Sequence, residues 1–247
     1  MTLIFAHRGS AGTHPENTME SFIAAEKCGA DGIELDVHLS KEGEIVVIHD
    51  ETVDRTTNGK GFVQDFFLSD LKSLNASYKF KTFQSFIRVP RIPTLREVFD
   101  WMKGNQLQCN IELKNGKIMY PFLEEKVIDL IREYQYEERI IISSFNHYSL
   151  VHCYQLAPDI ETAPLYSEGL YMPWIYARAI HAKGMHPNMK AAPDMIIRGA
   201  IEDGIAVRPY TVNKKEDMER LIAIKCSAII TDYPEKAKKI KKQMMKT

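Results

Sequence analysis

Residues 109–145 read CNIELKNGKIMYPFLEEKVIDLIREYQYEERIIISSF and contain a complete strand–helix–strand pattern. Two short apolar runs, Cys109–Leu113 and Ile140–Phe145, flank the segment Phe122–Tyr134, whose apolar residues recur with the 3.6-residue period of a helix. This order is typical of two parallel strands joined by a crossover helix. It predicts an α/β fold.

The same alternation extends in both directions along the chain. Further strands are expected at Leu3–Ala6, Gly32–Val37, Ile45–His49, Thr162–Tyr166, Gly184–His186, Val207–Val212 and Ala228–Thr231. Further helices are expected at Thr18–Lys27, Thr94–Lys103, Tyr148–Ala157, Trp174–Ala182, Asp194–Asp203, Lys215–Lys225 and Glu235–Met245. A chain of 247 residues fits one (β/α)₈ TIM barrel, which typically takes roughly 250 residues, so we expect a single domain over residues 1–247.

Two segments depart from this rhythm. Only Gly43 and polar neighbours separate the second and third strands, which is too short for a crossover helix, so a hairpin is expected there, with His49 opposite Asp36. Residues 51–93 are rich in turn residues and lack a clear period, and we interpret them as an insertion at the mouth of the barrel. Such an insertion either shapes substrate access or is a surface elaboration.

Charge and cysteine content exclude several classes of protein. Lys and Arg number 32 against 33 Asp and Glu, which gives no field that would attract nucleic acid. The apolar run near the start, Leu3–Ala6, is far too short for a signal peptide or a membrane span, so a cytoplasmic protein without stable membrane insertion is expected. The four cysteines show no paired spacing and are expected to be reduced thiols.

Glu34 and Asp36 stand two positions apart in an expected strand, so both carboxylates point to one face. Ile33, Leu35 and Val37 point to the other face, toward the helices. Two acids inside a barrel repel each other and lose hydration unless a cation or basic groups hold them. A hard divalent cation, Mg²⁺ or Ca²⁺, suits these oxygen ligands.

Glu112 and Lys114 repeat this spacing on another strand. They add a third acid and a base to the same face, although a plain internal salt bridge between the two is the alternative interpretation.

His7 and Arg8 follow the first strand directly, at the rim where barrel enzymes keep their active sites. The guanidinium of Arg8 offers a planar fork suited to phosphate oxygens. His49 ends the third strand in the same way. Two histidines beside paired acids favour an acid and a base that act near neutral pH.

These residues resemble the glycerophosphodiester phosphodiesterase family, relatives of the phosphatidylinositol-specific phospholipases C. The resemblance covers nearly the whole chain, and its motifs occur in the family's order: His7-Arg8-Gly9, Pro15-Glu16-Asn17-Thr18, Glu34-Leu35-Asp36-Val37, Val46-Val47-Ile48-His49-Asp50, Glu112-Leu113-Lys114, Ser144-Phe145, Thr211-Val212-Asn213 and Thr231-Asp232-Tyr233-Pro234. One position departs from the pattern, because many members have Trp where this chain has Tyr210.

The resemblance implies a role for each candidate residue. Glu34, Asp36 and Glu112 would hold one divalent cation, and His7 and His49 would form the acid–base pair. Arg8 and Lys114 would bind the phosphate, and Glu16 would orient Arg8 or the glycerol. Tyr210 would supply the aromatic wall of the substrate site. We assign His7 as base and His49 as acid. The sequence leaves the reverse assignment open.

The reaction implied is hydrolysis of a small glycerophosphodiester to sn-glycerol 3-phosphate and an alcohol, in phospholipid or glycerol metabolism. A rival activity on lysophospholipids or phosphatidylinositol would need an acyl-chain groove, for which the insertion offers Phe62, Phe66, Phe67, Phe80, Phe83 and Phe86. A catalytically silent binding barrel is a second rival. It is disfavoured because both histidines and all three acids are present.

Overall fold

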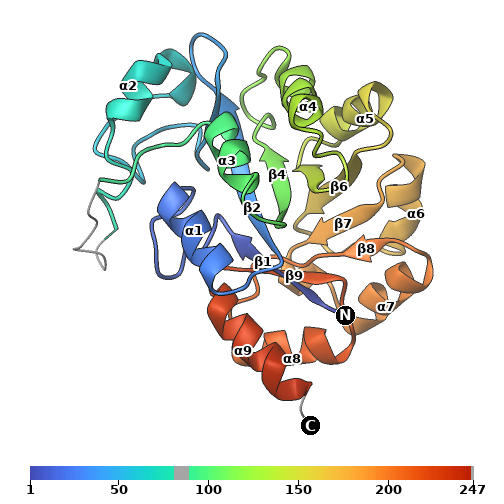
Figure 1. The fold of residues 1–247 in the computed structure, drawn as a ribbon. Coiled ribbons are helices and arrows are strands. Elements are labelled where there is room, and N and C mark those ends of the chain that lie inside the picture. Colours follow the sequence, from blue (N-terminus) through green and yellow to red (C-terminus); the bar gives the residue numbers. More distant parts are fainter. Residues whose placement is uncertain (81–88, 246–247) are drawn as a thin grey trace.

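The computed structural model describes residues 1–80 and 89–245. Within these residues, strands form a ring and helices cover its outside (Figure 1). The strands are β1 (Leu3–His7), β2 (Gly32–Leu39), β3 (Ile45–Val47), β4 (Gln108–Leu113), β5 (Ile140–Ser144), β6 (Glu161–Tyr166), β7 (Gly184–Pro187), β8 (Ala206–Val207) and β9 (Ala228–Thr231). All except β3 run parallel, which confirms the predicted TIM barrel.

The helices lie close to their predicted positions. They are α1 (Met19–Lys27), α2 (Leu68–Ser73), α3 (Leu95–Met102), α4 (Leu123–Tyr134), α5 (His147–Leu156), α6 (Pro173–Ala179), α7 (Asp194–Glu202), α8 (Lys215–Ala223) and α9 (Pro234–Met244). Helix α2 was not predicted. It lies within the segment interpreted as an insertion.

The parallel strands follow the order β8-β7-β6-β5-β4-β2-β1-β9. Strand β9 meets the segment after β8, where the Ile230 amide donates to the Pro209 carbonyl (3.0 Å) and the Val212 amide donates to the Ile230 carbonyl (2.9 Å). On its other side β9 pairs in parallel with β1, which brings the first and last thirds of the chain together. Side chains at the ends of β1 and β9 therefore become neighbours.

Strand β3 forms the predicted hairpin with β2, but its register differs from the expected one. Val37 pairs with Val47, and the Ile48 amide donates to the Asp36 carbonyl (3.1 Å). Ile48 therefore lies opposite Asp36, and the expectation for His49 was wrong by one residue. The hydrophobic pattern explains the difference, because Val46 and Ile48 share the small apolar cluster that packs residues 51–80.

The two faces of β2 have the predicted chemistry. Ile33, Leu35 and Val37 are buried in the main hydrophobic cluster together with Phe22 of α1 and Phe99 of α3. Because side chains alternate along a strand, Glu34 and Asp36 point to the opposite, inner face. Packing of the apolar face of β2 against the outer helices therefore directs the side chains of Glu34 and Asp36 to the inside of the barrel.

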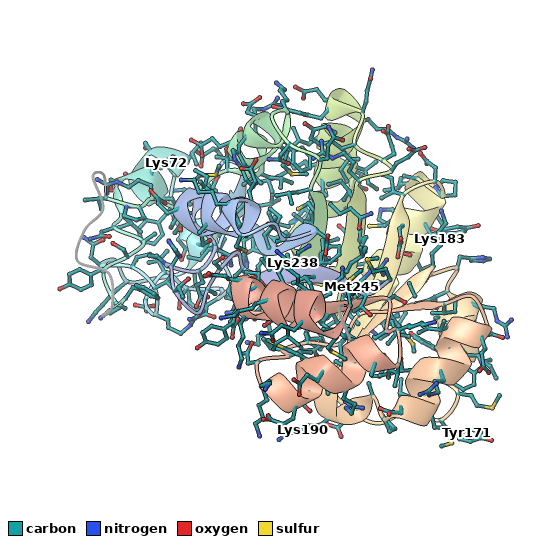
Figure 2. All side chains as sticks on the ribbon, turned by 60° about the horizontal axis from the view of Figure 1, so that its bottom comes forward. Lys72, Tyr171, Lys183, Lys190, Lys238 and Met245 are labelled. Atoms are coloured by element: carbon teal, nitrogen blue, oxygen red, sulfur yellow. The ribbon has the colours of Figure 1, made fainter. Side chains whose placement is uncertain are left out.

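Residues 51–80 form a lobe beside β3, which we call the insertion lobe. It contains the 3₁₀ helix η1 (Val63–Asp65) and α2, and Val53, Val63 and Leu71 pack against Val46 and Ile48. Lys72 on α2 and Tyr171 before α6 lie on opposite sides of the molecule (Figure 2). Phe83 and Phe86, two of the phenylalanines considered for an acyl groove, lie outside the described residues.

Two further expectations concern the cysteines and the membrane. All four cysteines lie within the described residues and are free thiols, as predicted. Across residues 1–80 and 89–245, no helix combines the length and the apolar character that a membrane span requires.

Candidate active site

Strand register brings the three predicted acids together. Asp36 on β2 pairs with Glu112 on β4, and Glu34 is the next inward-facing residue of β2. Glu34 and Asp36 are buried, and oxygen atoms of all three carboxylates lie within 4.8 Å of one another. The acids predicted from two strands therefore form one cluster at the carboxyl end of the barrel strands.

The electrostatics of this cluster are unfavourable for three negative charges. Burial, reinforced by the charges of Asp36 and Glu112, raises the pKa of Glu34 well above its usual range. Burial and the Asp36 charge raise the pKa of Glu112 to about 7. For Asp36, burial acts in the raising direction, but the charges of Arg8 and Lys114 outweigh it and lower the pKa.

The cluster fits a hard divalent cation. One oxygen of Asp36, Oδ1, is buried without a hydrogen-bond partner. A cation would occupy the shared space, partner this oxygen and hold all three carboxylates ionised. Oxygen ligands of this kind suit Mg²⁺ or Ca²⁺ rather than a soft metal.

His7 ends β1 next to Glu34, with which it pairs in register. Its Nδ1–H donates to Asp232 Oδ1 (2.6 Å), and the other oxygen of Asp232 accepts from Asn213 Nδ2 (2.5 Å). The Nδ1 donation leaves Nε2 as the acceptor nitrogen, and Nε2 lies 4.0 Å from Glu34 Oε2. The imidazole is therefore held in one tautomer, with its basic nitrogen toward the acid cluster.

His49 lies on the other side of the cluster and has its own aspartate. Its Nδ1–H donates to Asp50 Oδ1 (2.5 Å), and Nε2 accepts from Lys114 Nζ (3.2 Å). Burial lowers the pKa of His49, against the Asp36 charge, which raises it. Both predicted histidines thus present Nε2 toward the cluster and Nδ1 toward an aspartate.

Lys114 joins several of these groups. Its Nζ lies 2.7 Å from Glu112 Oε1 and 3.7 Å from Asp36 Oδ1, in addition to its contact with His49. The salt bridge between Glu112 and Lys114 that the spacing allowed is therefore present. It is one contact of a larger group, however, and leaves Lys114 at the centre of the site.

Arg8 is held beside the cluster by a sharp turn after β1. The residue has a positive φ of 53°, and its amide donates to Glu34 Oε2 (2.9 Å). Gly9 follows with φ 78°, and a Cβ there would lie 2.7 Å from the Ser21 backbone, so no larger residue fits. Arg8 Nη1 donates to Glu16 Oε1 (2.8 Å), and this contact holds the guanidinium in place.

The site contains partners that were not identified from the sequence. Asp50 and Asp232 orient the two histidines, and Arg55 of the insertion lobe donates to both Asp50 (Nε to Oδ2, 2.6 Å) and Glu16 (Nη1 to Oε2, 2.8 Å). Asp50 stands next to His49 and Asp232 follows the last strand, so position alone could have suggested both. Arg55 carries no such signal, because it lies in a turn-rich segment without a period.

Tyr210 lies at the rim, after β8. Its hydroxyl donates to the Tyr166 carbonyl (3.2 Å), and its ring meets Phe145 edge-on, with centroids 6.2 Å apart. The hydroxyl is engaged, so the ring is the part that Tyr210 offers to a ligand. Tyr210 and Phe145 therefore form an aromatic pair at the rim, and its role as a wall of the substrate site stays a prediction.

The sequence of this chain is similar to those of known phosphodiesterases. The family model for the glycerophosphoryl diester phosphodiesterase family matches residues 7–236. A glycerophosphodiester phosphodiesterase of Caldanaerobacter subterraneus subsp. tengcongensis is 49% identical over 95% of each chain, and one of Bacillus altitudinis is 41% identical over 99% of this chain and 100% of its own.

The barrel also resembles solved structures. An Oleispira antarctica phosphodiesterase in complex with the product sn-glycerol-3-phosphate superimposes with a TM-score of 0.84 at 29% identity, covering 97% of this chain and 96% of that one. Sequence, fold and the cluster of acids with two histidines lead to the same conclusion. The chain belongs to the glycerophosphoryl diester phosphodiesterase family.

Proposed function

We propose that the protein hydrolyses glycerophosphodiesters to sn-glycerol 3-phosphate and an alcohol, as one barrel domain over residues 1–247. The observation that carries this proposal is the placement of two oriented histidines on either side of a buried three-carboxylate cluster. The Oleispira relative, whose structure holds sn-glycerol-3-phosphate, supports the same product.

Charge stabilisation is the first task of the site. Arg8 follows β1 and Lys114 follows β4, on either side of β2, and both lie close to Asp36 (3.5 and 3.7 Å), where both can contact phosphoryl oxygens. A divalent cation, Mg²⁺ or Ca²⁺, when bound by Glu34, Asp36 and Glu112, supplies further positive charge to those oxygens. Positive groups fixed before the reaction stabilise charge that develops in the transition state.

Proton transfer is the second task. We assign His7 as the base, because among the described residues its Nε2 faces Glu34 and has no cationic hydrogen-bond partner, while Asp232 stabilises the imidazolium that forms. We assign His49 as the acid that protonates the leaving alcohol: in this role it acts as the imidazolium supported by Asp50, with Lys114 on the phosphoryl oxygens instead of on Nε2. One water is consumed, the phosphorus–oxygen bond to the alcohol breaks, and both histidines regain their starting state after the product leaves.

Two routes fit these roles, attack by the neighbouring glycerol hydroxyl through a cyclic phosphate and direct attack by water. A substrate that lacks this hydroxyl separates them, because only direct attack still cleaves it.

The test of the proposed function is a substrate panel with purified protein and added Mg²⁺ or Ca²⁺. Glycerophosphocholine, glycerophosphoethanolamine, glycerophosphoglycerol and glycerophosphoinositol are assayed for release of glycerol 3-phosphate. Turnover of at least one, lost in the His7→Ala variant, is expected. Failure of all four with either ion contradicts the proposal.

A further inference from the structure

A buried histidine to which the proposed reaction gives no task lies beside His49. His38 is the next inward-facing residue of β2 after Asp36, and it is completely buried. Its Nε2 lies 3.1 Å from the carbonyl oxygen of His49, and its Nδ1 lies 2.9 Å from the hydroxyl of Tyr120. We call these two contacts the Tyr120–His38–His49 bridge.

The partners of the His38 ring determine which nitrogen carries its proton. A carbonyl oxygen can only accept a hydrogen bond, so Nε2–H donates to His49. Nδ1 is then the acceptor nitrogen and receives the hydroxyl proton of Tyr120, which is buried in the loop after β4. The bridge therefore connects this loop with the end of the hairpin of β2 and β3.

The carbonyl that His38 holds belongs to the peptide bond between His49 and Asp50. The contact of His49 Nδ1 with Asp50 Oδ1 joins adjacent residues, so it orients the imidazole relative to Asp50 but lets both move together. The hairpin supports the chain up to Ile48, whose amide donates to the Asp36 carbonyl (3.1 Å). His38 therefore attaches the His49–Asp50 pair to the strand that carries two acids of the cluster.

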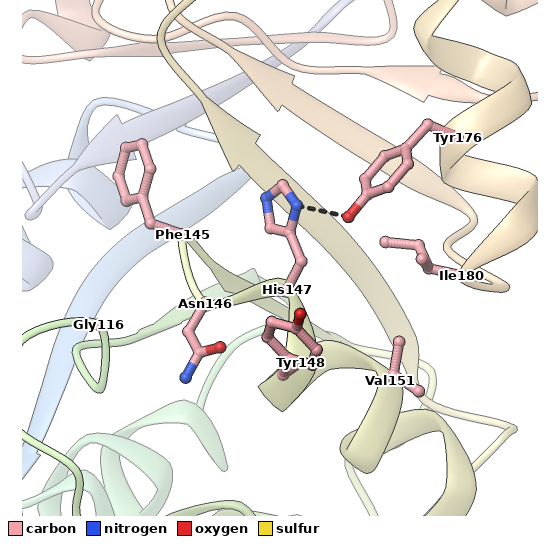
Figure 3. A pocket seen from close by; sticks show the side chains of 8 residues that line it. All are labelled: Gly116, Phe145, Asn146, His147, Tyr148, Val151, Tyr176 and Ile180. Atoms are coloured by element: carbon pink, nitrogen blue, oxygen red, sulfur yellow. Dashed lines mark hydrogen bonds between the residues drawn. The ribbon is translucent and has the colours of Figure 1, made fainter.

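The same arrangement occurs a second time at the rim. His147 Nε2–H donates to the Leu165 carbonyl (2.8 Å), and Nδ1 accepts from the Tyr176 hydroxyl (2.8 Å). Figure 3 shows this histidine in the cavity between α5 and α6, with a dashed line to Tyr176. We call these contacts the Tyr176–His147–Leu165 bridge. It ends on β6, which β5 and β4 separate from β2, and on a residue without a role in proton transfer, so it is a matched control.

We propose that His38 is a positioning residue for His49, which it holds through the peptide bond between His49 and Asp50. This rests on the proposed function, in which His49 protonates the leaving alcohol. An acid must lie within hydrogen-bond reach of the atom that it protonates, so a small shift of this peptide bond slows the reaction. A purely structural role of His38 would instead change stability and leave the dependence on the leaving group unaltered.

The first test locates the proton on His38 and needs no substrate. The histidine rings are labelled with an NMR-active nitrogen isotope, and His38→Gln identifies the signals of His38 by their loss. We expect a proton on Nε2 and none on Nδ1. A proton on Nδ1 alone removes the donor to His49 and overturns the inference, whatever the protein hydrolyses.

The second test exchanges the donor at nearly constant side-chain length. Met and Gln have similar lengths, but the amide Nε2–H of Gln can replace the imidazole Nε2–H at the His49 carbonyl. His38→Met should lower kcat about ten- to hundredfold with little change in KM, because the acid acts in the transition state. His38→Gln should stay within roughly threefold of the wild type, since the hydrogen bond is kept.

The substrate is the glycerophosphodiester of the panel that is turned over fastest, and thermal unfolding checks that each variant folds. His147→Met removes the control bridge and should leave kcat unchanged. Equal kcat values in folded His38→Met and His38→Gln overturn the inference and leave the proposed function intact. If His38→Met does not fold, Tyr120→Phe takes its place, because it removes the hydroxyl partner of His38 and keeps the ring.

The leaving group separates positioning from a general loss of structure. With p-nitrophenol as leaving group, protonation is barely needed, so most of the loss in His38→Met should disappear. Tyr120→Phe should show a smaller loss with the same dependence on the leaving group. A loss that is equal for both leaving groups means that His38 is only structural, and the inference is wrong.

A double-mutant cycle identifies the histidine that depends on His38. Combined with His49→Ala, His38→Met should cause little further loss of kcat, because the group that it positions is absent. Combined with His7→Ala, the loss caused by His38→Met should persist in full. A full additional loss in the His49→Ala background overturns the inference.

Discussion

The two histidines of the site have the same local arrangement but are supported in different ways. Asp232 accepts from His7 across 225 positions of sequence and is held in turn by Asn213, a neutral residue that also accepts from the Asp232 amide (3.0 Å). Asp50 adjoins His49 in sequence and is held by the guanidinium of Arg55. One pair is supported by the closed barrel, and the other by a charged side chain of the insertion lobe.

This difference indicates which perturbations reach which histidine. Arg55 is 46% exposed, so salt screens its charge, and it also donates to Glu16, the partner of Arg8. Its hydrogen bonds, with that of His49, lower the pKa of Asp50 to about 2 although burial acts in the raising direction. Changes in the insertion lobe should therefore reach His49 and Arg8 and leave His7 oriented.

The largest expected loss of turnover comes from removing the cation or its ligands. It should affect the steps of both histidines, because the acid cluster lies between them. Exhaustive chelation, or Glu34→Gln with Asp36→Asn, should lower turnover by about 10³-fold or more, the equivalent of several kcal/mol of transition-state stabilisation. Activity is measured before and after chelation, and again after Mg²⁺ or Ca²⁺ is returned. Full activity in thoroughly chelated protein contradicts the cation assignment.

The second prediction separates the roles of the two histidines. His7→Ala and His49→Ala should each lose on the order of 10² to 10⁴ in kcat, the usual contribution of one general acid or base. With p-nitrophenol as leaving group, protonation is barely needed, so His49→Ala should be partly rescued and His7→Ala should stay inactive. Rescue of His7→Ala alone reverses the two roles.

The third prediction tests the barrel-supported pair. Asp232 accepts hydrogen bonds on both oxygens, and an Asn side chain can accept on only one, so Asp232→Asn must break either the His7 or the Asn213 contact. We expect a loss in kcat on the order of 10²-fold that the p-nitrophenyl substrate does not repair. Asp31→Asn is the matched control, since Asp31 also accepts on both oxygens, from the Ile4 amide and from Lys238, and lies at the other end of β1.

The smallest expected effect concerns Arg55, which we regard as a positioning residue. Arg55→Ala should lower kcat roughly tenfold, as is usual for residues that orient a catalytic group. Part of the loss should disappear with the p-nitrophenyl substrate, because the defect acts through His49. Because salt screens the charge of Arg55, added salt should lower kcat of the wild-type protein. This salt dependence should be absent in the variant.

Arg96→Ala is the control for this prediction. Arg96 forms an exposed two-point pair with Glu133, away from the site, and its loss should leave the kinetics unchanged. A rise in KM alone, equal for both leaving groups, would mean that Arg55 acts only through Glu16 and Arg8.

Features that depend on spacing along one strand were predictable from the sequence. The period of two places Glu34 with Asp36, and Glu112 with Lys114, on one face whatever the rest of the chain does. The alternation of strands and helices predicts parallel strands, and parallel strands end at the same edge. The sequence alone therefore predicted the barrel, the acids on its inner face and the histidines at its rim.

Features that depend on register and closure were decided by the tertiary structure. The pairing of Asp232 with His7 needs β9 to lie beside β1, and the Asp36–Glu112 contact needs one particular alignment of β2 with β4. Side-chain periodicity is the same for several alignments, so only the packed core selects among them, as the one-residue error at β3 illustrates. Arg55 reaches Asp50 and Glu16 because Val53 and its apolar neighbours pack the insertion lobe against β3. No local pattern encodes that contact.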